Sequence, residues 1–482
     1  MLRRQALLTP FAFATSNEIA ETTAGRVRGM TGNSVTVFRA IPYAKQSRFL
    51  PPNKLDGWTG ERDCTRTGLR CVQGPGNIFL SPTIGEYFRG SKDRAELAPQ
   101  PESEDCLVLN VLTPSRRGTR PVMVYIHGGG FTGGSSHLTL FADRFPAEQD
   151  VVLVGVNHRI NVFGYLHLGA IDARFENGNA GQLDLIAALE WVRDNIANFG
   201  GDPHNVTIFG ESGGAAKISA LLFMPAARKL FQRAILESGS ILKVQTRDEA
   251  EAGARALLAK VPLDKLLTLP APELFSAVTN QGVRFEPAVD GRTIPTQLWQ
   301  AGPPIDVPLI IGCCKDETSL FTLKDEALYH LDDSGLRSRV PAPLIAAYRR
   351  AHPQDSPSDI WFRYATDRER RASGIRQAER YLERDRSFIF MYRFVWNTPL
   401  VEGKIRAFHT AELPLALRLV RFTESEAVSK TIAAAWSNFA RHGTPRWPRY
   451  TLDKRTTRIF DSPVSTVVND PDPETRLLIG PG

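Results

Sequence analysis

The sequence predicts an α/β protein in which a mostly parallel β-sheet is covered by helices on both faces. From about residue 120 onward, short apolar runs rich in β-branched residues alternate with segments of helical periodicity. Continuous apolar strands separated by helices are typical of parallel sheets that are buried on both faces. In such sheets, ligands bind at the carboxyl ends of the strands. The expected strands are 122–126, 151–156, 206–209, 234–236, 307–312 and 388–395, with a helix over 184–199.

Composition excludes several other classes of protein. The chain has 482 residues, of which 42% are hydrophobic and 23% charged, as in globular proteins. No apolar run reaches the roughly 18 residues that a membrane span needs. The net charge is +7, but the arginine-rich stretch 367–386 is interleaved with glutamates and is interpreted as a solvated helix face, so no nucleic-acid partner is expected. The five cysteines show no metal-binding spacing.

The N-terminus is expected to be a separate segment. Residues 1–16 are interpreted either as a short signal peptide or as a disordered end, because Arg3 and Arg4 precede an apolar stretch that closes with an Ala-Phe-Ala sequence. Pro10 interrupts that stretch. The signal interpretation favours an extracytoplasmic protein, periplasmic or secreted. No repeat or low-complexity linker divides the remainder, so 17–482 are expected to form a single domain.

Ser212 is the predicted nucleophile. It lies in Gly-Glu-Ser-Gly-Gly (210–214), directly after the strand 206–209 and before a helix-compatible segment, 215–223. This G-x-S-x-G pattern in a strand–turn–helix context exposes a serine at a sharp, strained turn whose neighbours must lack bulk. A phosphate-binding loop is the alternative, but no lysine follows in the manner of a Walker motif.

A second glycine motif follows the strand 122–126. In His-Gly-Gly-Gly-Phe (127–131), three glycines leave backbone N–H groups uncovered. Esterases of this architecture take oxyanion donors from such a loop and from the residue after the nucleophile. Gly129, Gly130 and Gly213 are therefore the predicted oxyanion hole. A merely flexible loop is the alternative, but two motifs in the expected chain order argue against it.

The base and the acid should follow the serine in the order acid, then histidine. Four histidines come after Ser212, and His409 follows the strand 388–395 after a short glycine-containing loop, as a base should. The other three occupy a charged stretch or surface-like positions: His330, His352 and His442. The strand 307–312 is followed by Asp316 and Glu317, and either carboxylate fits the spacing.

Together these motifs resemble the type B carboxylesterase family of α/β-hydrolases, which includes cholinesterases and bacterial para-nitrobenzyl esterases. The similarity extends from about residue 21 to 461. The matching segments are 41–44, 103–111, 127–131, 157–159, 178–181, 199–203, 209–212, 290–291, 315–317 and 409–414. The resemblance implies an α/β-hydrolase fold with a central, mostly parallel sheet, flanking helices, and long loop and helical insertions.

The resemblance also implies roles that the spacing leaves open. The family uses the glutamate of its Lys-Asp-Glu motif, so Glu317 becomes the triad acid and His409 the base. Gly213 stands where the family usually has alanine. Three pairings are implied as well: a Cys71–Cys106 disulfide and the ion pairs Arg48–Glu104 and Arg159–Asp184.

The expected activity is hydrolysis of neutral, short- to medium-chain carboxylic esters through an acyl-enzyme, without metal or organic cofactor. Phe131, Glu211 and Phe285 are expected to contact substrate, although a core position fits either phenylalanine nearly as well. No tryptophan lies between Cys71 and Cys106, so the best cation–π platform for a choline group is missing. The expected partner is a small ester, and the chain a monomer or weak homo-oligomer.

Two alternatives remain. The same triad can cleave amides or carbamates, and the sequence does not separate these reactions from ester hydrolysis. The family also contains non-catalytic adhesion modules, but those typically lack the serine, which is present here.

Overall fold

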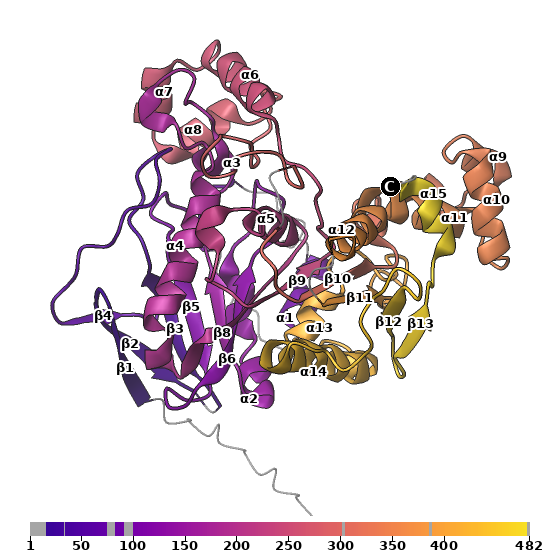
Figure 1. Ribbon diagram of the computed structural model, residues 1–482, viewed down its shortest axis with the longest axis horizontal. Helices are drawn as coiled ribbons and strands as arrows, with labels where there is room; N and C mark the ends of the chain where they lie inside the picture. The colour runs from indigo at the N-terminus through magenta and orange to yellow at the C-terminus, as the bar shows by residue number, and fades with distance from the viewer. Residues whose placement is uncertain are drawn as a thin grey trace, which may run out of the picture.

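The computed structural model describes residues 16–32, 34–74, 82–90, 100–300, 304–384 and 388–479. Within these ranges a 13-stranded sheet runs through the molecule in the order β1-β2-β3-β5-β7-β6-β8-β9-β10-β11-β12-β13, and β4 pairs with β2 (Figure 1). The strands are β1 (Ser16–Thr22), β2 (Gly25–Thr31), β3 (Thr36–Pro42), β4 (Glu61–Asp63), β5 (Val108–Thr113), β6 (Arg120–Ile126), β7 (Val152–Val156), β8 (Gly201–Glu211), β9 (Arg233–Glu237), β10 (Leu309–Cys314), β11 (Ile389–Phe394), β12 (Thr456–Phe460) and β13 (Thr466–Asn469).

The prediction of a mostly parallel sheet is confirmed. The strands from β7 to β12 pair in parallel throughout. Antiparallel pairing is confined to the two ends of the sheet, at β1, β2, β3 and β5 and at β13. All six expected strands are present, and β8 begins five residues earlier than predicted.

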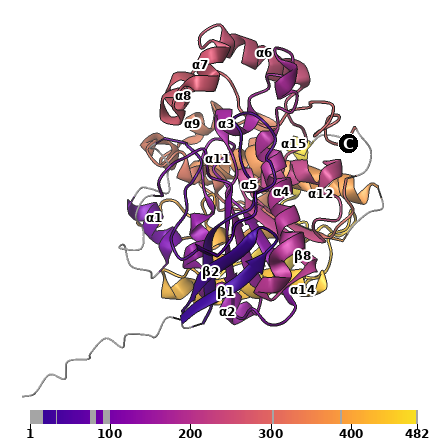
Figure 2. The same cartoon turned by 90° about the vertical axis from the view of Figure 1, so that its left-hand side faces the viewer.

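Helices connect and cover the strands. They are α1 (Pro82–Arg89), α2 (Arg144–Gln149), α3 (Asn161–Tyr165), α4 (Ala180–Asn195), α5 (Gly213–Leu221), α6 (Arg247–Leu258), α7 (Leu263–Thr268), α8 (Ala271–Val278), α9 (Asp333–Arg337), α10 (Ala342–Ala351), α11 (Pro357–Thr366), α12 (Ala372–Leu382), α13 (Glu412–Ala416), α14 (Glu426–His442) and α15 (Arg476–Ile479). Both views place α6, α7 and α8 together at one end of the molecule (Figures 1 and 2). No helix in the described ranges has the length and apolar character needed to cross a bilayer.

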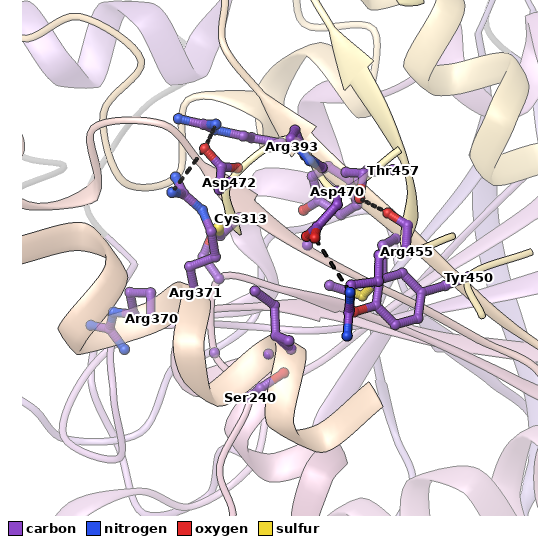
Figure 3. A pocket seen from close by; sticks show the side chains of 18 residues that line it. Ser240, Cys313, Arg370, Arg371, Arg393, Tyr450, Arg455, Thr457, Asp470 and Asp472 are labelled. Atoms are coloured by element: carbon purple, nitrogen blue, oxygen red, sulfur yellow. Dashed lines mark hydrogen bonds and ion pairs between the residues drawn. The ribbon is translucent and has the colours of Figure 1, made fainter. Parts of the chain in front are cut away.

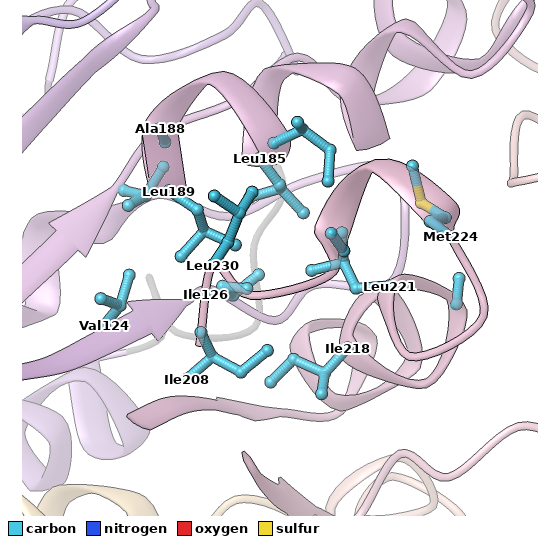
Figure 4. Close-up of a cluster of buried hydrophobic side chains, with 14 of the residues drawn as sticks. Val124, Ile126, Leu185, Ala188, Leu189, Ile208, Ile218, Leu221, Met224 and Leu230 are labelled. Carbon is cyan, nitrogen blue, oxygen red and sulfur yellow. The ribbon is translucent and has the colours of Figure 1, made fainter. Parts of the chain in front are cut away.

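The central strands pack against α4 and α5. In Figure 4, Ile126 of β6 and Ile208 of β8 lie among Leu189 of α4 and Ile218 and Leu221 of α5, and all five side chains are buried. Each such side chain contributes roughly 1.5–3 kcal/mol of stability when it leaves water. This layer fixes α5 against the end of β8, and so fixes the turn that carries Ser212.

One expectation about charge is wrong. The stretch 367–386 was predicted to form a solvated helix face, yet Asp367, Arg371 and Glu379 within it are buried. A π-helical turn, Asp367–Arg371, joins α11 to α12, and Arg371 forms an ion pair with Asp367 inside the protein. Because buried charges of opposite sign compensate one another, a charged sequence need not mark a solvated face.

Candidate active site

Ser212 lies at the tip of the turn between β8 and α5. Its φ is 54° and its ψ is −120°, a strained conformation for a residue that carries a side chain. The Ser212 N–H donates a hydrogen bond to the Glu237 carbonyl on the neighbouring strand β9, at 2.8 Å. The turn thus holds the serine hydroxyl at the carboxyl end of the parallel sheet, where the sequence places the nucleophile.

Two other predicted residues meet Ser212 there. Nε2 of His409 lies 2.8 Å from Ser212 Oγ, and Nδ1 of the same ring is hydrogen-bonded to the Glu317 carboxylate. Cys314 N–H donates to the other Glu317 oxygen at 2.7 Å, which orients the carboxylate. Asp316 faces elsewhere, 3.5 Å from Lys315 and 3.8 Å from Arg406. The carboxylate beside the histidine is therefore Glu317.

The protonation of this pair follows from burial and mutual charge. Burial lowers the pKa of His409, and the Glu317 carboxylate offsets this only in part. Burial acts to raise the pKa of Glu317, but the His409 imidazole beside it holds that pKa below its usual value. At neutral pH the imidazole is thus neutral and the carboxylate ionised. A neutral imidazole that contacts a hydroxyl can accept its proton.

Two of the three glycines of the 127–131 loop have backbone conformations that favour glycine. Gly129 has φ 85° and Gly130 has φ 61°, in the left-handed region. Gly213 has no such dihedral angle, but a Cβ there would lie 2.1 Å from the Gly130 carbonyl oxygen. All three glycines line the same cavity as Ser212. The structure thus brings together the backbone groups predicted to bind an oxyanion.

That cavity has a volume of about 940 Å³ and contains Ser212 and His409 in its wall. Phe131 and Glu211 line it as predicted, whereas Phe285 does not, and instead packs against the hydrophobic core. Sequence reasoning missed several wall residues, which are Ile241, Phe275, Leu320, Phe321 and Arg370. They come from separate segments with no shared motif, so no local pattern identifies them.

Buried carboxyl groups surround Ser212 and His409. Glu211 Oε1 lies 3.2 Å from His409 Nε2, and burial raises the pKa of Glu211 well above its usual value. Burial also raises the pKa of Glu237 to about 8 and that of Glu412 to about 7. Glu412 accepts a hydrogen bond from Tyr392 at 2.9 Å. Burial thus favours the uncharged form of all three carboxyl groups, and Glu412 titrates close to neutral pH.

Of the three pairings that the resemblance implies, the two ion pairs are formed and the disulfide is not. Arg159 Nη2 lies 2.6 Å from Asp184 Oδ1, with both side chains buried, and Arg48 Nε lies 2.9 Å from Glu104 Oε2. Cys71 and Cys106 are both free, buried thiols. They lie side by side, and a hydrogen bond to Cys71 raises the pKa of the Cys106 thiol. The disulfide is not formed in the structure and stays a prediction.

A second, smaller cavity of about 40 Å³ shares Gly239 and Arg370 with the first. Figure 3 shows Asp472 between Arg371 and Arg393 at its edge. Oxygens of Asp472 and Glu474 and a nitrogen of His352 lie within 4.8 Å of one another, close enough to bind one metal ion. Asp472 already forms ion pairs with the two arginines, however. His352 was expected at the surface. It is instead half-buried, 2.7 Å from Glu474.

Comparisons with known proteins agree with this geometry. The sequence profile of the carboxylesterase family matches residues 16–463. The para-nitrobenzyl esterase of Bacillus subtilis (strain 168) is 35% identical, over 97% of this chain and 99% of its own length. Phenmedipham hydrolase of Pseudarthrobacter oxydans is 31% identical, over 94% of this chain and 97% of its own.

Comparison with solved structures also finds carboxylesterases. A Geobacillus stearothermophilus carboxylesterase superposes with a TM-score of 0.80 at 35% identity, over 95% of this chain and 99% of that chain. A structure of PNB esterase superposes with a TM-score of 0.78 at 33% identity, over 97% of this chain. The mostly parallel sheet with flanking helices is therefore that of the α/β-hydrolases. The chain belongs to the carboxylesterase family and is a carboxylic-ester hydrolase.

Proposed function

We propose that this esterase cleaves neutral, short- to medium-chain esters through Ser212, His409 and Glu317. The observation that carries the proposal is the 2.8 Å contact between Ser212 Oγ and His409 Nε2 at the wall of the large cavity. His409 accepts the hydroxyl proton as Ser212 Oγ bonds to the carbonyl carbon. Glu317 holds the imidazole in place and stabilises the imidazolium that forms.

The tetrahedral intermediate carries its negative charge on the former carbonyl oxygen. The N–H groups of Gly129, Gly130 and Gly213 are proposed to donate to that oxygen. When the C–O bond to the alcohol breaks, His409 returns the proton to the leaving oxygen, and an acyl group stays on Ser212. Water then attacks the acyl carbon while His409 takes its proton. The bond between the acyl carbon and Ser212 Oγ breaks, His409 returns the proton to Oγ, and the acid leaves. This scheme uses no metal or organic cofactor.

The cavity wall supports neutral rather than cationic substrates. Phe131, Phe275 and Phe321 give it apolar surface. The raised pKa of Glu211 favours the uncharged form of that carboxyl group, and Arg370 adds a positive charge to the wall. A carbamate is the second candidate substrate, because one relative is named phenmedipham hydrolase and the same triad attacks a carbamate carbonyl.

The first test removes the nucleophile. Ser212→Ala should fold normally and lose turnover of a 4-nitrophenyl butyrate ester by roughly 10⁴-fold or more, because no other group can form the acyl-enzyme. Turnover should be measured beside the matching anilide and carbamate. Faster Ser212-dependent cleavage of the carbamate than of the ester would replace the proposed substrate class with the second candidate.

The second test concerns the acid. Glu317→Gln should lower kcat severely, because a neutral amide cannot stabilise the imidazolium. Asp316→Asn is the matched control, since Asp316 lies next to Glu317 in the chain but contacts Lys315 and Arg406. It should keep most of the activity. An inactive Asp316→Asn beside an active Glu317→Gln would reverse the assignment.

A further inference from the structure

Lys217 carries a buried amino group that the proposed reaction does not use. It lies on α5, five positions after Ser212, and its side chain is fully buried. Removing an ammonium group from water costs several kcal/mol unless other groups replace the water. No ion pair of Lys217 with a carboxylate is found among the described residues, and burial alone lowers its pKa to about 7. A group so costly to bury should have a specific role.

The groups that replace water around Lys217 belong to the 127–131 loop. Nζ donates to the Gly130 carbonyl at 2.9 Å and to the His127 carbonyl at 3.1 Å, and it lies 5.5 Å from the centre of the Phe131 ring. The two carbonyls belong to the peptide groups 127–128 and 130–131. The peptide groups between them carry the N–H of Gly129 and Gly130. Lys217 therefore anchors the loop on both sides of its two proposed oxyanion donors.

Gly213 provides independent evidence of this arrangement. Its backbone is compatible with alanine, yet a Cβ there would lie 2.1 Å from the Gly130 carbonyl oxygen. Real contacts of a Cβ are longer, so the Gly130 carbonyl occupies the space that an alanine side chain would need. The same oxygen accepts the shorter of the two Lys217 hydrogen bonds. Lys217 and Gly213, both on α5, thus pack against the same carbonyl group of the loop.

We propose that Lys217 is a positioning residue, which ties the carbonyls of His127 and Gly130 to α5 and so holds the N–H groups of Gly129 and Gly130 beside Ser212. The inference rests on the proposed ester hydrolysis for its kinetic consequences, but the anchoring itself does not. An oxyanion donor is effective only when it is already in place. Loss of the anchor should therefore reduce the stabilisation of the transition state more than it reduces the binding of substrate.

The kinetic test uses Lys217→Met, which removes both hydrogen bonds, and Lys217→Gln, which keeps an N–H donor without charge. Lys217→Met should lower kcat roughly 10- to 100-fold, somewhat less than the loss of an oxyanion donor, with KM changed less than about threefold. Lys217→Gln should recover part of the loss. Lys260→Met, at an exposed position of the same residue type, is the control and should match the wild type. A Lys217→Met enzyme with unchanged kcat would overturn the proposal.

A double-mutant cycle with Gly213→Ala tests the contact itself. In the wild-type background the new methyl group must displace the anchored Gly130 carbonyl, so kcat should fall roughly 100-fold. In the Lys217→Met background that carbonyl is free to move, and the further loss should be less than about fivefold. Independent, multiplicative losses in the two backgrounds would contradict the coupling.

Hydrogen–deuterium exchange gives a readout without substrate. In Lys217→Met, amides of the peptide that contains 127–131 should exchange at least about tenfold faster than in the wild type, while a peptide from α14 should not change. Equal exchange in the two proteins would overturn the anchoring. If wild-type protein shows no Ser212-dependent ester turnover, the proposed function fails, and the exchange comparison still decides on Lys217.

Discussion

In the proposed mechanism, the ionisation of His409 determines when the Ser212 hydroxyl can lose its proton. The lowered pKa of this imidazole predicts that kcat/KM for a neutral ester rises with pH along a single-proton curve whose midpoint lies below the ordinary histidine value of 6.5. Below the midpoint the imidazolium cannot accept the serine proton. Glu317→Gln removes the anion that raises this pKa, so its residual activity should have a midpoint shifted further toward acid. A wild-type midpoint above 7 would contradict the burial argument.

The same residues show how far sequence reasoning reaches. Ser212, His409 and the three glycines were identifiable because each follows a recognisable strand within a short motif. Local spacing did not separate Asp316 from Glu317, because the choice depends on which side chain turns toward His409. Lys217 and Arg370 could not be found at all. Their burial and their neighbours depend on contacts with segments distant in the chain.

Among the secondary-structure elements, the buried parallel strands were predictable and the sheet edges were not. Strand β7 is a continuous apolar run with every residue buried. By contrast, β13 exposes all four residues, and β2 contains two arginines and two glycines. The alternation that distinguishes a strand is weak in such segments. The π-helical turn Asp367–Arg371 was also missed, because its buried ion pairs resemble a solvated charge pattern in sequence.

The predicted disulfide between Cys71 and Cys106 can be tested directly. Under oxidising conditions the two adjacent thiols should join, and peptide mapping without reductant should recover them as one linked pair. In the chain-entropy estimate, closing a loop of this length stabilises the fold by up to about 4 kcal/mol. Reductant should therefore lower the Tm of the wild type but not that of a Cys71→Ser, Cys106→Ser double variant. Cys64, which is also a buried free thiol, should stay unlinked, and Cys64→Ser should keep the reductant effect.

At the scale of the whole molecule, two sources of positive charge act on a charged substrate. The net charge of +7 acts at long range and is screened over about 8 Å at physiological salt. Arg370 lies in the wall of the cavity itself and near enough to the triad to lower the pKa of Glu317. A local charge in a partly enclosed cavity is screened less than a dispersed surface charge, so Arg370 should dominate discrimination against cations.

This argument predicts the substrate preference. Butyrylcholine should be cleaved with a lower kcat/KM than its uncharged 3,3-dimethylbutyl isostere, a comparison that measures transition-state discrimination. Arg370→Gln should reduce the difference by roughly 10- to 20-fold, because one charge at about 10 Å and an effective dielectric near 20 contributes about 1.7 kcal/mol. Arg368→Gln is the matched control: it lowers the net charge equally, but its side chain is exposed and lies beside Glu369 outside the cavity wall. It should leave the ratio nearly unchanged.

If both variants change the ratio equally and added salt abolishes the effect, the long-range field governs selectivity. A wild-type preference for butyrylcholine would instead require an anionic or aromatic site for its ammonium group, and would refute the neutral substrate class.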